Sequence, residues 1–341
     1  MIPLPVKYRP STFDSVVEQD SIKRTLQNQI NKNKIKNVYL FCGSAGTGKT
    51  TTARLFAYAL NGAEENVCEL DAASHSSVEN VRTIIDDSKY HPVGTPYKIY
   101  IIDECHALSS QAWKALLKTL EEPTKTSIFI MCTTDPQKVP VAVMSRAQRF
   151  DFKKISHAGI VSRLKWIIEQ ENSDGHNYTY TDEAIEYIAK LAEGGMRTAI
   201  TRMSTVLDLS DDVTIDTVVE AISTVSYDTL FDLLKSLCIM DKKKVVQIIE
   251  QAHMSGTDLK QLMQQFTDFT LEMNMYGLFN DFEYLHIPPT YKDKMSDFSD
   301  SDYAFFTQLL EVMLKLCDDI KWNQSPKSLI EATFLLLCTE A

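Results

Sequence analysis

The chain has 341 residues, of which 44% are hydrophobic, and its formal net charge is −11 at pH 7. These values predict a soluble globular protein of two or three domains, and the acidity argues against non-specific binding of nucleic acid by the whole surface. The sequence has neither an apolar stretch of the ~20 residues that span a membrane nor the apolar core of a signal peptide, which argues against membrane and secreted proteins.

The first half of the sequence alternates short apolar runs with helical patterns. This alternation predicts a parallel sheet with helices on both faces, an α/β fold. The expected strands cover residues 38–42, 67–70, 99–102 and 128–132, and the expected helices cover 49–61, 77–89 and 110–121. Ser76 and Glu79 have the spacing of a capping box at the start of the second helix, and Pro123 is expected to stop the third.

The second half is expected to be helical, because the strand signal fades from about residue 156. Short amphipathic helices are expected at 156–171, 182–193, 196–209 and 214–222, and further helices at 226–239, 242–253, 257–278, 302–321 and 326–338. The stretch 279–301 contains Pro288-Pro289 and many Asp and Ser residues, so it is expected to be a loop.

Residues 43–50 match the phosphate-binding pattern G-x-x-x-x-G-K-[ST] without a mismatch and lie between an expected strand and an expected helix. The glycines allow successive backbone N–H groups to point into one concavity, at which the following helix aims its positive end. Lys49 would reach the β- and γ-phosphates of ATP, and the Thr50 hydroxyl would be a ligand of Mg²⁺. The predicted nucleotide-binding residues are Gly43, Ser44, Ala45, Gly46, Thr47, Gly48, Lys49, Thr50 and Thr51.

A second motif predicts the rest of an ATPase site. Residues 98–104 form an apolar strand that ends in two acids, Asp103 and Glu104. Asp103 would hold the Mg²⁺ shell, and Glu104 would orient and polarise the attacking water. A solvated strand end is the alternative, and it would be favoured if the phosphate-binding loop were absent.

Eight stretches in the first 200 residues resemble, in the same order, the gamma/tau ATPase subunit family of the bacterial DNA polymerase III clamp loader. They are KYRPSTFDSVVEQDSI (7–22), the phosphate-binding loop, ELDAASHSSVENVR (69–82), KIYIIDECHAL (98–108), ALLKTLEEP (115–123), TTDPQKVP (133–140), SRAQRFDF (145–152) and GGMRTAI (194–200). The resemblance implies an AAA+ nucleotide-binding domain over residues 1–155, a small helical lid domain over 156–223 and an all-α collar domain over 224–341.

The resemblance also implies roles for single residues. Tyr8, Arg9 and Pro10 fall where the family packs against adenine, and Thr134 falls at the first sensor position. Arg146 matches the arginine that reaches into the neighbouring subunit's site, and Arg197 matches the second sensor on the lid domain. An arginine from a neighbour would stabilise charge on the transferred phosphoryl group. Taken alone, both arginines would be ordinary surface residues.

The chain departs from the family pattern in two places. The four-cysteine zinc module is replaced by residues 61–66, and the seven cysteines are scattered without a C-x-x-C pair, so no zinc is expected. Cysteines scattered in this way also favour a reducing cytoplasm. Ala147 follows Arg146 where the family has cysteine. The chain ends near the expected end of the collar, as in the short form of the family.

The function implied by the resemblance is clamp loading. ATP binding would let a pentameric ring of subunits open a sliding clamp, and hydrolysis would close the clamp on primer–template DNA. DNA contacts would come from helix N-termini and from cations, with Arg82 and Lys118 as candidates that read the backbone. The alternative for both is that they are ordinary exposed cations.

Three other functional classes stay open on sequence grounds. Another AAA+ DNA motor or helicase loader would carry a DNA-engaging hairpin or a winged helix, and the sequence indicates neither. A structural ring subunit without ATP turnover would have a damaged phosphate-binding loop, whereas residues 43–50 match in full. A nucleotide kinase would need neither Arg146 nor a helical collar.

Overall fold

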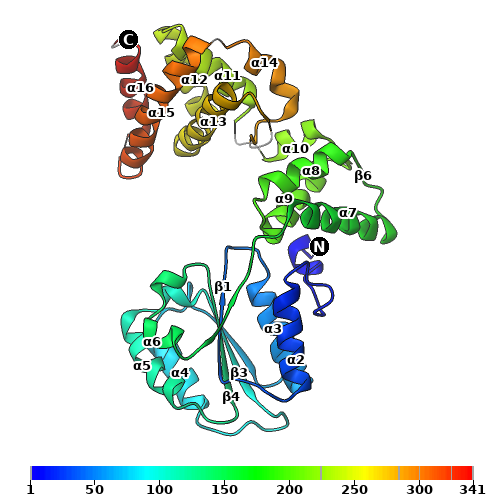
Figure 1. Ribbon diagram of the computed structural model, residues 1–341. Helices are drawn as coiled ribbons and strands as arrows, with labels where there is room; N and C mark the ends of the chain where they lie inside the picture. The colour runs from blue at the N-terminus through cyan, green and yellow to red at the C-terminus, as the bar shows by residue number, and fades with distance from the viewer. Residues whose placement is uncertain (1, 223–224, 283–284, 299, 324, 340–341) are drawn as a thin grey trace. The chain divides into compact units, whose positions relative to one another are not determined.

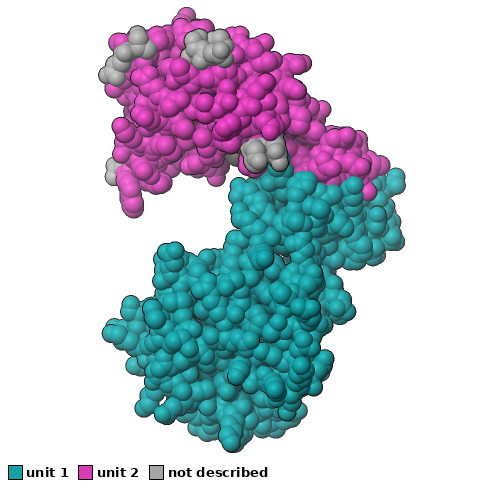
Figure 2. Space-filling model, viewed as in Figure 1, with its two compact units in different colours: residues 1–178, 188–204 teal, residues 179–187, 205–341 magenta. Residues whose placement is uncertain are grey.

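The structure, a computed structural model, describes residues 2–222, 225–282, 285–298, 300–323 and 325–339. The chain divides into two compact units, residues 1–178 with 188–204 and residues 179–187 with 205–341 (Figure 2). The predicted boundary between residues 223 and 224 lies outside the described residues. The finer division into three domains stays a prediction.

Unit 1 is built on a parallel five-stranded sheet in the order β2-β3-β4-β1-β5. The strands are β1 (Val38–Cys42), β2 (Val67–Asp71), β3 (Lys98–Asp103), β4 (Ser127–Thr133) and β5 (Gln148–Asp151). The four predicted strands are confirmed. The fifth, β5, was not predicted, because only Phe150 of its four residues is buried and the other three are polar.

Helices cover both faces of this sheet, as predicted (Figure 1). One core cluster joins the sheet to α2 (Asp20–Asn31) and α3 (Lys49–Asn61), and the other joins it to α4 (Val78–Asp87) and α5 (Ser110–Glu121). Short elements are α1 (Leu4–Lys7), η1 (Cys105–Ala107), η2 (Pro136–Lys138) and α6 (Val141–Met144). Helix α2 was not predicted from the sequence. The predicted start of α4 was wrong by one residue, because Ser77 and not Ser76 is the N-cap.

The rest of the described chain is almost entirely helical, as predicted. The helices are α7 (His157–Ser173), α8 (Asp182–Leu191), α9 (Met196–Leu209), α10 (Ile215–Ile222), α11 (Tyr227–Cys238), α12 (Lys242–Met254), α13 (Leu259–Phe279), α15 (Asp300–Ile320) and α16 (Pro326–Leu337). The loop expected at 279–301 instead contains η3 (Pro289–Tyr291) and α14 (Lys292–Ser296), which follow Pro288 at a helix N-cap. A small parallel sheet pairs β6 (Thr179–Tyr180) with β7 (Asp212–Val213).

Among the described helices, none combines the length and the apolar character that crossing a membrane requires.

The direction of the strands positions the functional residues. Because all five strands are parallel, the segments that follow β1, β3 and β4 meet at the carboxyl edge of the sheet. The segments that precede β1 and β5 meet at the opposite, amino edge, since the first residue of β5, Gln148, lies beside Tyr39 near the start of β1.

Gly43 is the tightest backbone position beside the carboxyl edge, and we expect Gly43→Ala to destabilise unit 1. Its φ is +151°, and a Cβ there would lie 2.5 Å from the carbonyl oxygen of Phe152. Thermal or urea unfolding should report a loss of about 1–3 kcal/mol. The neighbouring exposed Ser44→Ala should change stability by less than about 0.5 kcal/mol. Equal stability of the two variants would contradict this account of the loop.

Candidate nucleotide-binding site

The phosphate-binding loop follows β1 directly and turns into α3 at Gly48, as the motif predicts. Gly46 and Gly48 have φ angles of +75° and +97°, which glycine adopts without strain. The segment before α9 packs on this loop, and the N–H of Met196 donates to the Gly46 carbonyl at 3.0 Å. A Cβ on Gly46 would lie 3.2 Å from Gly195 Cα, so a side chain there would crowd this contact.

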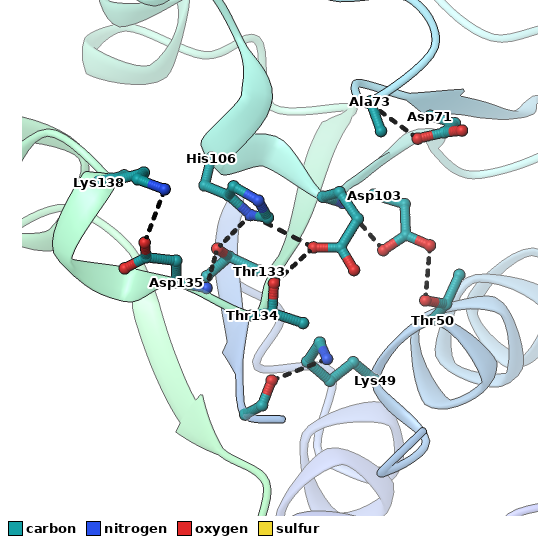
Figure 3. Close-up of polar contacts among 12 residues, drawn as sticks. Lys49, Thr50, Asp71, Ala73, Asp103, His106, Thr133, Thr134, Asp135 and Lys138 are labelled. Atoms are coloured by element: carbon teal, nitrogen blue, oxygen red, sulfur yellow. Dashed lines mark hydrogen bonds and ion pairs between the residues drawn. The ribbon is translucent and has the colours of Figure 1, made fainter. Parts of the chain in front are cut away.

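Lys49 is a buried cation at the centre of the loop. Its side chain folds back (Figure 3). Nζ donates to the carbonyl oxygens of Gly43 at 2.8 Å and Ser44 at 2.9 Å. Among the residues that the structure describes, no carboxylate oxygen lies within 4.0 Å of this ammonium group, although Lys49 is only 5% exposed. A buried ammonium without a counter-charge is costly, so the site fits an anionic phosphate.

Thr50 and Asp103, the two predicted Mg²⁺ ligands, lie together at the carboxyl edge. The Thr50 hydroxyl donates to Oδ2 of Asp103 at 2.7 Å, and the N–H of Glu104 donates to Oδ1 at 3.0 Å. Burial raises the pKa of Asp103 above its usual value. A hydroxyl and a carboxylate suit Mg²⁺, which in ATPases takes one or two protein oxygens and completes its shell with phosphate and water.

Glu104 is held in a left-handed conformation, with φ 45° and ψ 43°, immediately after β3. Its Oε2 accepts a hydrogen bond from the Thr134 hydroxyl at 3.0 Å and lies 3.3 Å from Nδ1 of His106 (Figure 3). The predicted catalytic base and the predicted first sensor are therefore in direct contact. A non-glycine residue in this conformation costs about 1–3 kcal/mol, which surrounding contacts must offset.

His106 is a site residue that the sequence analysis missed. Its Nδ1 lies 3.1 Å from the Thr133 hydroxyl as well as near Glu104, so the ring bridges the end of β3 to the end of β4. The only sequence signal was its position two residues after Glu104.

Tyr8 lies in a buried contact with α7. Its ring meets Trp166 edge-on at 5.6 Å between centroids, and Arg163 donates to its carbonyl oxygen at 3.0 Å. Burial raises the pKa of Tyr8 to about 12. Arg9 beside it is exposed and Pro10 is half-buried. The adenine contact expected for these three residues stays a prediction.

Arg197 is the second residue of α9 and is exposed. Its backbone lies against the phosphate-binding loop, since a Cβ built on Gly46 would be 3.3 Å from Arg197 N. Within unit 1 the structure therefore brings this segment to the loop, as a second sensor requires.

Arg146 lies at the other edge of the sheet. It precedes β5 by two residues, whereas the phosphate-binding loop follows the paired strand β1. Its guanidinium pairs with Glu121 at 2.9 Å and donates to the Ala142 carbonyl at 2.7 Å. The structure thus does not bring Arg146 to its own subunit's phosphate-binding loop.

The two candidate DNA contacts are both exposed and lie on neighbouring helices. Arg82 is in the second turn of α4, near its N-terminus, whereas Lys118 is in the last turn of α5. Only Arg82 therefore lies near the start of its helix. Their role stays a prediction.

Comparisons with known proteins agree with the motifs. A family model described as "DNA polymerase III, delta subunit" matches residues 63–156. DNA polymerase III subunit tau of Bacillus subtilis is 32% identical to this chain over 97% of its length, and the chain spans 62% of that protein. Subunit tau of Escherichia coli is 32% identical over 75% of the chain, which spans 43% of it. The chain therefore spans less than two thirds of either relative.

Among solved structures, the RuvB Holliday junction branch migration motor of Thermotoga maritima has a TM-score of 0.52 to this chain at 20% identity. The match covers 67% of this chain and 79% of that one. At this identity the likeness shows the fold alone.

We expect Lys49→Ala to abolish tight ATP binding, because the charge on the β- and γ-phosphates is lost. Isothermal titration of the purified chain with ATP measures this. Lys138→Ala is a matched control, since Lys138 is 66% exposed and pairs with Asp135 outside the loop. Parental affinity in the Lys49 variant would remove the phosphate-binding assignment.

Glu104→Gln should retain ATP binding but lose turnover, because an amide keeps the shape of the side chain and cannot polarise water as a carboxylate does. We expect phosphate release to fall by about 10²–10⁴-fold, the usual contribution of a general base. The exposed Glu122→Gln should hydrolyse ATP as the parent does. Unchanged hydrolysis by the Glu104 variant would exclude it from the mechanism.

Proposed function

We propose that this chain, which belongs to the gamma/tau family of DNA polymerase III subunits, is an ATPase subunit of a sliding-clamp loader. It would use ATP binding and hydrolysis to open a clamp and load it on primer–template DNA. The support is a similarity to a tau subunit over 97% of the chain, together with a phosphate-binding loop and an Asp103-Glu104 pair that are both intact.

The observation that carries the proposal is the separation of Arg146 from its own phosphate-binding loop. Strand β1 has five residues, and at about 3.3 Å per residue it keeps the two edges of the sheet roughly 17 Å apart. An arginine at the amino edge would therefore act on a nucleotide bound to another subunit. Hydrolysis would then depend on how neighbouring subunits are placed.

At the chain's own site, each side chain would have a separate task. Lys49 would bind the β- and γ-phosphates, and Thr50 and Asp103 would hold Mg²⁺, which screens phosphate charge when bound. Glu104 would orient and polarise the attacking water. Thr134 would contact the γ-phosphate, and this contact would affect the position of Glu104, because the two side chains share a hydrogen bond at 3.0 Å. Arg197 would contact the nucleotide from the lid side.

The proposed partners are the other subunits of a pentameric ring, the sliding clamp and primer–template DNA. Arg82 and Lys118 would contact the DNA backbone without reading its sequence. We place this work in the cytoplasm, in keeping with seven free cysteines.

We also propose that the chain needs no zinc. The described residues contain no group of three or more His, Cys, Asp or Glu side chains arranged to hold a metal ion. Metal analysis of the purified chain should find no stoichiometric zinc, and one zinc per chain would overturn this.

Arg146→Ala tests the ring mechanism directly. ATP affinity of the isolated chain should stay nearly unchanged, because its own site keeps Lys49, Thr50 and Asp103. The assembled complex should lose DNA- and clamp-stimulated hydrolysis, by roughly 10³-fold or more if chemistry limits the rate and by less if release does. Steady-state phosphate release with and without clamp and DNA measures both.

A mixing experiment separates action between subunits from action within one chain. Arg146→Ala subunits combined with Lys49→Ala subunits should recover some hydrolysis, because the second kind can lend its arginine to a neighbour with an intact loop. If Arg146→Ala weakens ATP binding in the isolated chain and mixing restores nothing, Arg146 acts within its own chain or only in folding.

A further inference from the structure

A groove of about 650 Å³ lies at the amino edge of the sheet, away from the phosphate-binding loop, and three of its lining residues are cations. They are Lys34, Lys36 and Arg146, and the lining also includes Gln29 and Gln148. We propose that this groove receives the nucleotide-bearing edge of a neighbouring ATPase subunit, with Lys34 and Lys36 pairing with its anions beside Arg146. The inference rests on the proposed function, since it needs subunits that meet edge to edge.

A partly buried hydrogen-bond network connects two residues that line the groove, Gln29 and Gln148. The hydroxyl of Tyr39, which is fully buried in β1, accepts from the Lys36 N–H at 2.8 Å and donates to Oε1 of Gln29 at 2.9 Å. Nε2 of Gln29 then donates to Oε1 of Gln148 at 2.8 Å. The network ties the lysine-bearing segment to the segment that follows Arg146. The network holds the Lys36 backbone in a fixed relation to Gln148, the second residue after Arg146.

The two lysines face solvent because of how the chain leaves α2. Asn33 adopts a left-handed conformation, with φ 49°, and turns the chain out of the helix. In the following segment the side chain of Ile35 packs against the core cluster that contains β1, whereas Lys34 and Lys36 on either side of it are exposed. Both lysines line the groove.

Among the described residues, the ammonium groups of Lys34 and Lys36 have no ion-pair partner that binding would have to displace. Among the described residues no carboxylate oxygen lies within 4.0 Å of the ammonium group of Lys34 or Lys36. Arg146 differs, because it is paired with Glu121 at 2.9 Å. If Arg146 moved from Glu121 to a phosphate, it would exchange one anionic partner for another. The net gain in binding free energy from Arg146 would therefore be small. The unpaired lysines would therefore supply most of the added attraction.

The opposite edge of the same chain has the complementary charge. Three acidic residues lie at the ends of β2 and β3 there, namely Asp71, Asp103 and Glu104. The phosphates of a bound nucleotide would add further negative charge. Asp71 is exposed, and its carboxylate accepts hydrogen bonds from the Ser74 hydroxyl at 2.8 Å and the Ala73 N–H at 2.9 Å. A cationic groove at one edge and anions at the other match when subunits meet head to tail.

The test compares Lys34→Gln, Lys36→Gln and the double variant with Lys32→Gln in the full chain. Lys32 is an exposed lysine in the same short stretch that does not line the groove, so it controls for the loss of one charge. Sedimentation velocity in ATP measures association with the other ring subunits over a range of salt. We expect the double variant to associate roughly tenfold more weakly at low salt and to depend less on salt than the parent.

The other possible outcomes distinguish a failure of the groove inference from a failure of the proposed function. If the double variant associates like Lys32→Gln while Arg146→Ala loses stimulated hydrolysis, the groove inference is wrong and the clamp-loader proposal stands. If the parent chain never associates in ATP, the proposed function itself fails. If the double variant instead lowers only the affinity of the isolated chain for primer–template DNA, the groove binds nucleic acid and not a subunit. Thermal unfolding should be parental in all the lysine variants, because their side chains are exposed.

Discussion

The common direction of the five strands is the constraint on which the rest of unit 1 depends. It gathers the phosphate-binding loop, Asp103 and Thr134 at one edge of the sheet, and it gathers Arg146 and the lysines before β1 at the other. One chain therefore carries the candidate nucleotide site and a separate group of cations at opposite edges of the sheet. A surface with two unlike edges suits head-to-tail contacts, which close into rings when the rotation between subunits allows.

The electrostatics of the carboxyl edge make that site incomplete by itself. Lys49 is buried against two carbonyl oxygens with no carboxylate near it, and burial raises the pKa of Asp103. Both groups would be stabilised by what an ATPase binds, a phosphate for the ammonium and a cation for the carboxylate. The site thus carries two desolvation costs that a Mg–nucleotide complex would offset, in keeping with the general conflict between stability and function at active sites.

Much of this arrangement could be predicted from the sequence, because apolar runs and short motifs are local signals. Strands β1 to β4, the phosphate-binding loop and the Asp103-Glu104 pair all lie within single continuous stretches. The polar edge strand β5 lacked such a signal, whereas Ile22, Leu26 and Ile30 did have the spacing that indicates α2. The contact of His106 with Thr133 and the pairing of Arg146 with Glu121 depend on segments that only the fold brings together.

Strand β1 joins the two edges physically. Near its start, the Tyr39 hydroxyl donates to Gln29, which lines the cationic groove, and Cys42 at its end leads into the phosphate-binding loop. Between them the strand is fully enclosed, with Tyr39 and Phe41 packed against Phe56 and Phe150. A strand packed in this way adopts a single conformation. It would therefore hold the two edges at a fixed separation and would not act as a conformational switch. If neighbouring sites influence one another in a ring, the influence would travel through the rigid-body placement of whole subunits, which moves the cations at one edge toward or away from the next nucleotide.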